Sequence, residues 1–122
     1  MPAFPLRGSL RGDRGPRRLW IETLRDNVGS KMTALVERGA PRDMRDVYEL
    51  CHRGIMTMQD CWNLWRTKNP ARDAGEGAEK TLFHIERLTL QRPLEKVPQA
   101  DRDRAAALRT WFRDVFCPAG FP

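Results

Sequence analysis

The sequence has little that would mark a secreted or membrane-embedded protein. It has three cysteines, Cys51, Cys61 and Cys117. This odd number excludes a disulfide framework as the organising principle of the fold and favours a reducing cytoplasm. No apolar run approaches the roughly 18 residues that a membrane span needs, and the N-terminus lacks the apolar segment of a secretory signal. We therefore expect a cytoplasmic protein with no membrane partner.

Several kinds of catalytic and binding motif are also missing. The cysteines and histidines lack the Cys-x₂₋₄-Cys step that is typical of structural zinc sites, so we expect no bound metal. Gly75 and Gly77 follow no strand, which excludes a phosphate-binding glycine loop. His84 has no serine or cysteine at an activating position, so nothing supports hydrolytic catalysis.

Positive charge is concentrated at the N-terminus. The 122 residues carry 22 basic and 16 acidic side chains, a net charge of +6. Residues 1–18 hold five arginines and one aspartate, which gives +4 of this total. The same stretch is rich in glycine and proline and lacks apolar periodicity, so we expect a disordered basic leader. It is either a nucleic-acid-binding arm or an irregular start without a function of its own.

The rest of the chain has the pattern of an all-α protein. No segment alternates apolar and polar residues as a half-buried strand does, whereas apolar residues recur at spacings of three and four. We expect about five short helices in an irregular bundle over residues 19–117, followed by a tail at 118–122. The expected helices lie at about 19–38, 42–53, 58–68, 78–90 and 102–116, with 71–77 as a flexible link.

Turn and cap residues define the ends of these helices. Gly39 suits a left-handed C-cap, and Thr57 with Asp60 forms a variant of the capping box. Asp101 is expected to cap the last helix. The residues of that helix that we expect to face inward are Ala105, Leu108, Phe112, Val115 and Phe116.

Candidate functional residues lie between positions 31 and 46. At about 100° per residue, Lys31 falls on the edge of the apolar stripe of the first helix, and Arg38 falls on the same shoulder two turns later. Such a pair could hold a polyphosphate or an RNA backbone, or it could be an ordinary pair of amphipathic side chains. Arg42 and Asp46 have the spacing of a surface ion pair, and Asp43 suits the first turn of a helix.

The segment Lys31–Leu35, followed by Glu37–Tyr48, resembles the third and fourth motifs of the AbiEii-type nucleotidyltransferases. These enzymes are the toxins of bacterial abortive-infection and toxin–antitoxin systems. The shared pattern is a Lys-x-x-Ala helix, an Arg-Gly-x-Pro turn and an Arg-Asp-x-x-Asp helix start. A looser likeness extends to about Cys117 and includes the segment Arg92–Glu95.

The resemblance implies roles for individual residues. Lys31 would contact the nucleotide. Arg38, from its position on the helix, and Arg42 are further candidates for phosphate binding. Asp43 and Asp46 would be the acidic residues of the last motif, and Asp46, backed by Arg42, would be the principal carboxylate. The complete family enzyme uses a nucleoside triphosphate and magnesium, and an antitoxin protein would be its partner.

The chain departs from the family at the metal site. Two-metal nucleotidyl transfer needs paired carboxylates on a strand, after a Gly-Ser turn. Neither Gly8-Ser9 nor Gly29-Ser30 is followed by such a pair. We therefore expect a truncated family member that binds no cofactor by itself and performs no nucleotidyl transfer.

Two other interpretations stay open. The chain could be a small basic helical module that binds RNA or a protein without catalysis, or a remnant without function. Truncation predicts an exposed apolar patch, through which the chain could associate, along Trp20, Leu24, Val28 and the 44–48 face. The family interpretation requires Lys31 and Asp46 to face one phosphate-sized hollow.

Overall fold

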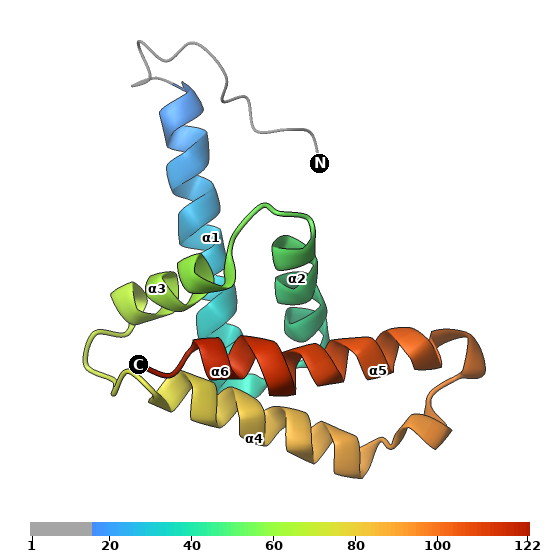
Figure 1. Ribbon diagram of the computed structural model, residues 1–122. Coiled ribbons are helices and arrows are strands. Elements are labelled where there is room, and N and C mark those ends of the chain that lie inside the picture. Colours follow the sequence, from blue (N-terminus) through green and yellow to red (C-terminus); the bar gives the residue numbers. More distant parts are fainter. Residues whose placement is uncertain (1–15) are drawn as a thin grey trace.

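The computed structural model describes residues 16–122, and all its regular elements are helices, which confirms the all-α prediction (Figure 1). Most of the predicted leader, residues 1–15, lies outside the described residues. The elements are α1 (Pro16–Arg38), α2 (Pro41–His52), α3 (Met58–Lys68), α4 (Glu76–Gln91), η1 (Leu94–Lys96), η2 (Gln99–Asp101), α5 (Arg102–Trp111), η3 (Phe112–Phe116) and α6 (Cys117–Ala119).

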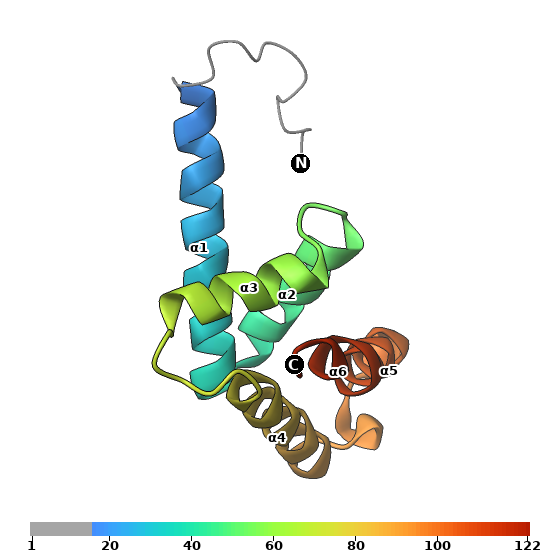
Figure 2. The same ribbon diagram turned by 60° about the vertical axis from the view of Figure 1, so that its left-hand side comes forward.

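The helices pack around the C-terminal half of α1. This half is crossed by α3 and also contacts α2 and α4. The N-terminal half of α1 projects beyond the other helices, as Figures 1 and 2 both show. At the opposite end of the molecule, α4 lies beside the continuous helical run formed by α5, η3 and α6. Within residues 16–122, no helix is both long and apolar enough to cross a membrane.

Most of the expected helix ends are observed. Gly39 ends α1 with a left-handed backbone, φ 61°, and its N–H donates to the Leu35 carbonyl over 2.8 Å. Thr57 and Asp60 form both hydrogen bonds of a capping box at the start of α3. These turns confirm that α1, α2 and α3 are separated where the sequence predicted.

Two predicted helix starts are wrong. α1 begins at Pro16 and not at Leu19, because a proline is well accommodated in the first helical turn. Asp101 does not cap α5. It closes η2 with φ −107° and ψ 0°, whereas a capping residue needs an extended backbone. Its carboxylate instead accepts a hydrogen bond from Arg104 over 2.6 Å.

The C-terminal residues are part of the bundle and not the expected tail. The segment Phe112–Phe116 is π-helical, and Phe112 and Phe116 are buried. Because the wider turn changes the helical phase, Val115 is 41% exposed, which contradicts the prediction that it faces inward. Helix continues to Ala119, and Gly120 is buried.

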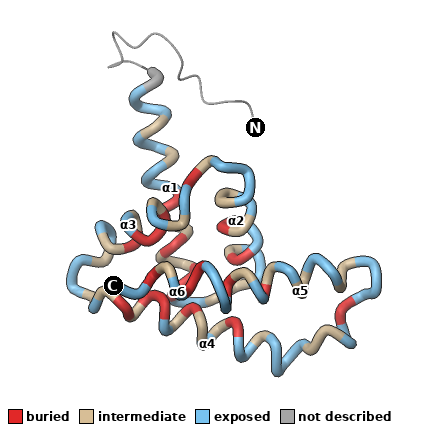
Figure 3. Tube along the Cα trace, viewed as in Figure 1, coloured by how far each residue is buried: buried red, intermediate tan, exposed pale blue. Residues whose placement is uncertain are grey.

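Buried residues lie where the helices face one another (Figure 3), and the largest of them are aromatic. Trp62 and Trp65 are fully buried, and the Trp62 indole donates a hydrogen bond to the Phe116 carbonyl over 2.9 Å. A Cβ atom on Gly77 would lie 3.0 Å from Trp62. Gly77 is buried inside α4, so the expected flexible link at 71–77 is in part packed helix. The contact with Trp62 explains why a glycine, which has no side chain, occupies position 77.

One buried charge lacks compensation. Arg109 is only 8% exposed, and its Nη1 atom is buried without a hydrogen-bond partner. Burial lowers the pKa of Arg109, and the nearby Arg92 lowers it further. Because a buried ion without a partner costs free energy, we expect this position to limit stability.

The Gly39 turn provides a test of the fold. A Cβ atom at Gly39 would lie 2.2 Å from Cγ of His84. Gly39→Ala should therefore lower the free energy of unfolding by roughly 3 kcal/mol, through left-handed strain and displacement of the imidazole. Gly54→Ala is the matched control, because Gly54 has φ 72° but open space around it. It should cost about 1 kcal/mol. Equal losses in urea denaturation would contradict this packing.

Arg109 provides a second test. Arg109→Met keeps an unbranched, apolar stem and removes the buried charge, so it should raise the free energy of unfolding by about 1 kcal/mol. The control is Arg113→Met, because Arg113 is exposed and bound to Asp114; this variant should change stability little. Thermal or urea denaturation measures both. A destabilised Arg109→Met variant would mean that the guanidinium is compensated in solution.

Candidate functional site

An open groove lies between α1 and α2. It has a volume of about 370 Å³, and its wall continues into the turn that follows α2. The residues that line it are Leu24, Asn27, Val28, Lys31, Asp46, Glu49, Leu50, Arg53 and Ile55. The groove is therefore within the size range of small-molecule sites.

Lys31 and Asp46 meet in this groove. The Lys31 Nζ atom lies 2.6 Å from Oδ2 of Asp46, and the two side chains are 33% and 42% exposed. The Gly39 turn reverses the chain between α1 and α2, so that the two helices present these residues to each other. The predicted juxtaposition of the ammonium and the carboxylate at one hollow is confirmed.

The rest of the groove combines an apolar surface with a second ion pair. Leu24, Val28, Leu50 and Ile55 supply the apolar surface. Arg53 Nε lies 3.0 Å from Oε1 of Glu49. Two cations and two anions therefore line the groove, and their formal charges cancel. A ligand would be held by direct contacts more than by a long-range field.

Three predicted site residues lie away from the groove. Arg38 and Arg42 are exposed, and Asp43 lies in the first turn of α2. None of the three lines the groove. The expected pairing of Arg42 with Asp46 is not present, because the Asp46 carboxylate pairs with Lys31 across the interhelical space instead. The structure thus brings together Lys31 and Asp46 only.

The described residues do not provide a metal site. Within 16–122, no three histidine, cysteine, aspartate or glutamate side chains lie close enough together to hold an ion. Asp43 and Asp46 are three residues apart on one helix, and Asp46 is already paired with a cation.

The predicted apolar patch is largely wrong. Val28, Met44 and Val47 are buried in the hydrophobic core, so most of the face that was expected to be open is covered. Leu24 is half-buried at the groove. Trp20 is 39% exposed. The other large apolar side chains that are exposed are Leu19, Phe83, Leu90, Val115 and Phe121.

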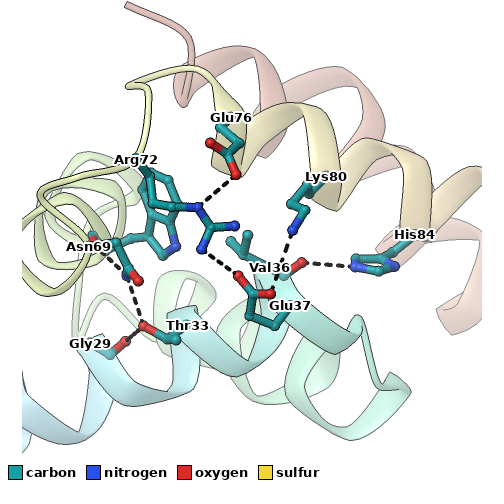
Figure 4. A network of polar contacts seen from close by, with 10 residues as sticks. Gly29, Thr33, Val36, Glu37, Asn69, Arg72, Glu76, Lys80 and His84 are labelled. Carbon is teal, nitrogen blue, oxygen red and sulfur yellow. Dashed lines mark hydrogen bonds and ion pairs between the residues drawn. The ribbon is translucent and has the colours of Figure 1, made fainter.

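A second polar cluster, which the sequence analysis missed, joins α1 to α4 (Figure 4). The Glu37 carboxylate lies 2.8 Å from Arg72 and 3.5 Å from Lys80. Arg72 also binds Glu76 over 2.7 Å. Because these charges satisfy one another, the cluster holds the two helices together. Helical spacing identifies the Arg72–Glu76 pair, but nothing in the local sequence reveals Glu37 as a partner.

His84 belongs to the same region and has a structural role. Its Nε2 atom lies 2.9 Å from the Val36 carbonyl, as Figure 4 shows. Since a carbonyl only accepts, Nε2 carries the hydrogen. Nδ1 is buried without a hydrogen-bond partner.

Comparison with known proteins adds no family assignment: neither the scan against family models nor the searches of curated proteins and solved structures finds a match. The functional interpretation therefore depends on the Lys31–Tyr48 motifs and the groove that they build.

The Glu37 cluster predicts a pH dependence of stability. The hydrogen bond from Arg72 lowers the pKa of Glu37 below its usual 4.5, and Lys80 adds a smaller attraction. A lowered carboxyl pKa contributes stability above the unfolded-state value, and this contribution is lost as the pH falls through the folded-state value. Glu37→Gln should therefore be less stable than the parent at neutral pH, and the difference should shrink toward about pH 3.

Urea denaturation at several pH values measures this effect. Arg72→Gln should remove more of the pH dependence than Lys80→Gln, because Arg72 lies closer to the carboxylate. A Glu37→Gln variant whose stability differs from the parent by the same amount at every pH would show that Glu37 is not paired in solution.

Proposed function

We propose that this chain is the helical, nucleotide-binding part of an AbiEii-type nucleotidyltransferase toxin and binds a nucleoside triphosphate in the groove between α1 and α2. The observation that carries the proposal is the 2.6 Å contact between Lys31 and Asp46 at an open groove. These are two of the motif residues that resemble the family, and they come from different helices.

The Lys31 ammonium suits a phosphate ligand. It has three N–H donors, and its hydrogen bond to Asp46 uses one of them. Two donors remain for phosphate oxygens, and the bond to Asp46 holds the flexible side chain at the groove. Pre-ordering of this kind lowers the entropy cost of binding.

The apolar wall suits the remainder of a nucleotide. Leu24 and Val28 from α1 face Leu50 and Ile55 across the groove. A purine or pyrimidine ring buries apolar area against such a surface, while its phosphates reach Lys31. The neutral balance of charges disfavours a bare polyanion and favours a ligand with both an apolar and a charged part.

We propose binding without transfer. Transfer of a nucleotidyl group depends on metal ions that stabilise the attacking and leaving oxygens. Residues 16–122 offer no three-residue ligand set for such ions. The carboxylates for this chemistry would have to come from another part of the complete enzyme.

A second candidate is a protein-binding helical module, which would include binding of an antitoxin. It is favoured by the projecting half of α1, where Leu19 is 64% and Trp20 is 39% exposed. Two large apolar side chains on an extended helix could form the centre of a protein interface. This candidate requires no ligand in the groove.

Titration of the ¹⁵N-labelled protein with ATP tests the proposed function. Amide shifts should move at Lys31, Asp46 and Leu50. Lys31→Ala should weaken binding by roughly 10- to 100-fold, the effect of losing charge-assisted hydrogen bonds. Lys68→Ala is the matched control, because Lys68 Nζ also lies 2.6 Å from a carboxylate, that of Asp26, but outside the groove.

The control should keep the affinity of the parent. If both lysine variants lost the same affinity for ATP, the effect would come from the change in net charge and not from a contact in the groove. Absence of any shift in the groove, together with shifts near Leu19 and Trp20 on addition of a protein partner, would favour the second candidate instead.

A further inference from the structure

Two cysteine thiols from neighbouring helices lie close together in the core. The Sγ atoms of Cys51 on α2 and Cys61 on α3 are 3.9 Å apart. Both cysteines are free thiols. The sulfurs need to approach to about 2.05 Å to form a disulfide, so closure requires a shift of less than about 2 Å shared by two side chains.

The two thiols differ in a way that assigns them different roles. Cys61 is fully buried, whereas Cys51 is partly exposed. Either sulfur can donate the hydrogen bond between them, and this contact lowers the pKa of Cys51 and raises that of Cys61. Cys51, the sulfur that solvent can reach, is therefore the one that loses its proton more readily. A reactive thiolate beside a second thiol is the arrangement found at redox-sensitive cysteine pairs.

We propose that Cys51 and Cys61 form a thiol–disulfide exchange site, in which Cys51 reacts with a small disulfide of the glutathione class and Cys61 resolves the product. This proposal does not rest on the proposed binding of a nucleotide in the groove.

The reaction takes place in two exchange steps. In the first step, the Cys51 thiolate attacks the disulfide, the reagent S–S bond breaks, and one reagent thiolate leaves. The Cys61 thiol then attacks Cys51 Sγ and gives its proton to the second reagent thiolate as that thiolate leaves, which forms the Cys51–Cys61 bond. The protein loses two hydrogens and two electrons, and the reagent disulfide is reduced to two thiols.

The local fold can accommodate this bond. The two cysteines are connected by the short turn between α2 and α3, where a Cβ atom added to Gly54 would meet no other atom within 4 Å. The turn therefore has room to adjust. Closure would fix the end of α2 to α3, next to Leu50 and Ile55 at the groove.

Cys117 provides an internal control. It is fully buried on α6, and burial raises its pKa to about 12. No contact with another cysteine sulfur is present for Cys117 in the described part of the chain, which includes all three cysteines. We expect it to remain a thiol while the other two react.

The test is equilibration of the full, reduced chain in buffers of oxidised and reduced glutathione, followed by acid quench, alkylation and peptide mass spectrometry. The parent should form a monomer that is lighter by two hydrogens, with a Cys51–Cys61 cross-link and unmodified Cys117. Cys61→Ser should stop at a glutathione adduct on Cys51, and Cys51→Ser should form neither product. Cys117→Ser should behave as the parent.

The parent chain alone makes the proposal falsifiable, even if a serine variant fails to fold. A stable glutathione adduct on the parent, a disulfide between two chains, or full alkylation of Cys51 and Cys61 after equilibration in excess oxidised glutathione would each overturn the proposal. Circular dichroism of each variant checks that the helical fold is retained.

Discussion

The contacts of Trp62 are the constraint on which the rest of this structure depends. Its indole donates to the Phe116 carbonyl, its ring leaves no room for a side chain at Gly77 or Gly120, and α3, which carries it, crosses α1. One side chain thus links the middle of the chain to the start of α4 and to the C-terminus. Because such a contact joins residues far apart in the sequence, its loss would separate several helices at once.

The groove follows from this arrangement. α3 fixes the C-terminal half of α1, and the Gly39 turn fixes where α2 begins. These positions of α1 and α2 bring Lys31 and Asp46 close together, and the two side chains form a partly exposed ion pair. An exposed pair contributes little to stability.

Local patterns in the sequence predicted what depends on neighbouring residues. Apolar spacing indicated the helices, and Gly39 and the Thr57–Asp60 box indicated where they end. The resemblance of the Lys31–Tyr48 segment to the family motifs predicted that Lys31 and Asp46 lie close together. The errors arose where distant contacts decide. Val115 turned outward because a π-helical segment changes the phase of the last helix, and the expected tail packs through Gly120 against Trp62, a residue from the middle of the chain. The ion pair between Glu37 and Arg72 was not predicted, because tertiary packing brings these two residues together.

The distribution of charge limits how the groove can select a ligand. Residues 1–18 carry +4 of the net +6, whereas the charged groups that line the groove cancel. Long-range attraction of a polyanion would therefore originate outside the groove and would be screened by salt. Contacts inside the groove act over a few ångströms, through Lys31 and the apolar wall, and are screened less. Selectivity of the proposed nucleotide binding over the binding of other anions would therefore come from the shape and chemistry of the groove, and not from the net charge of the protein.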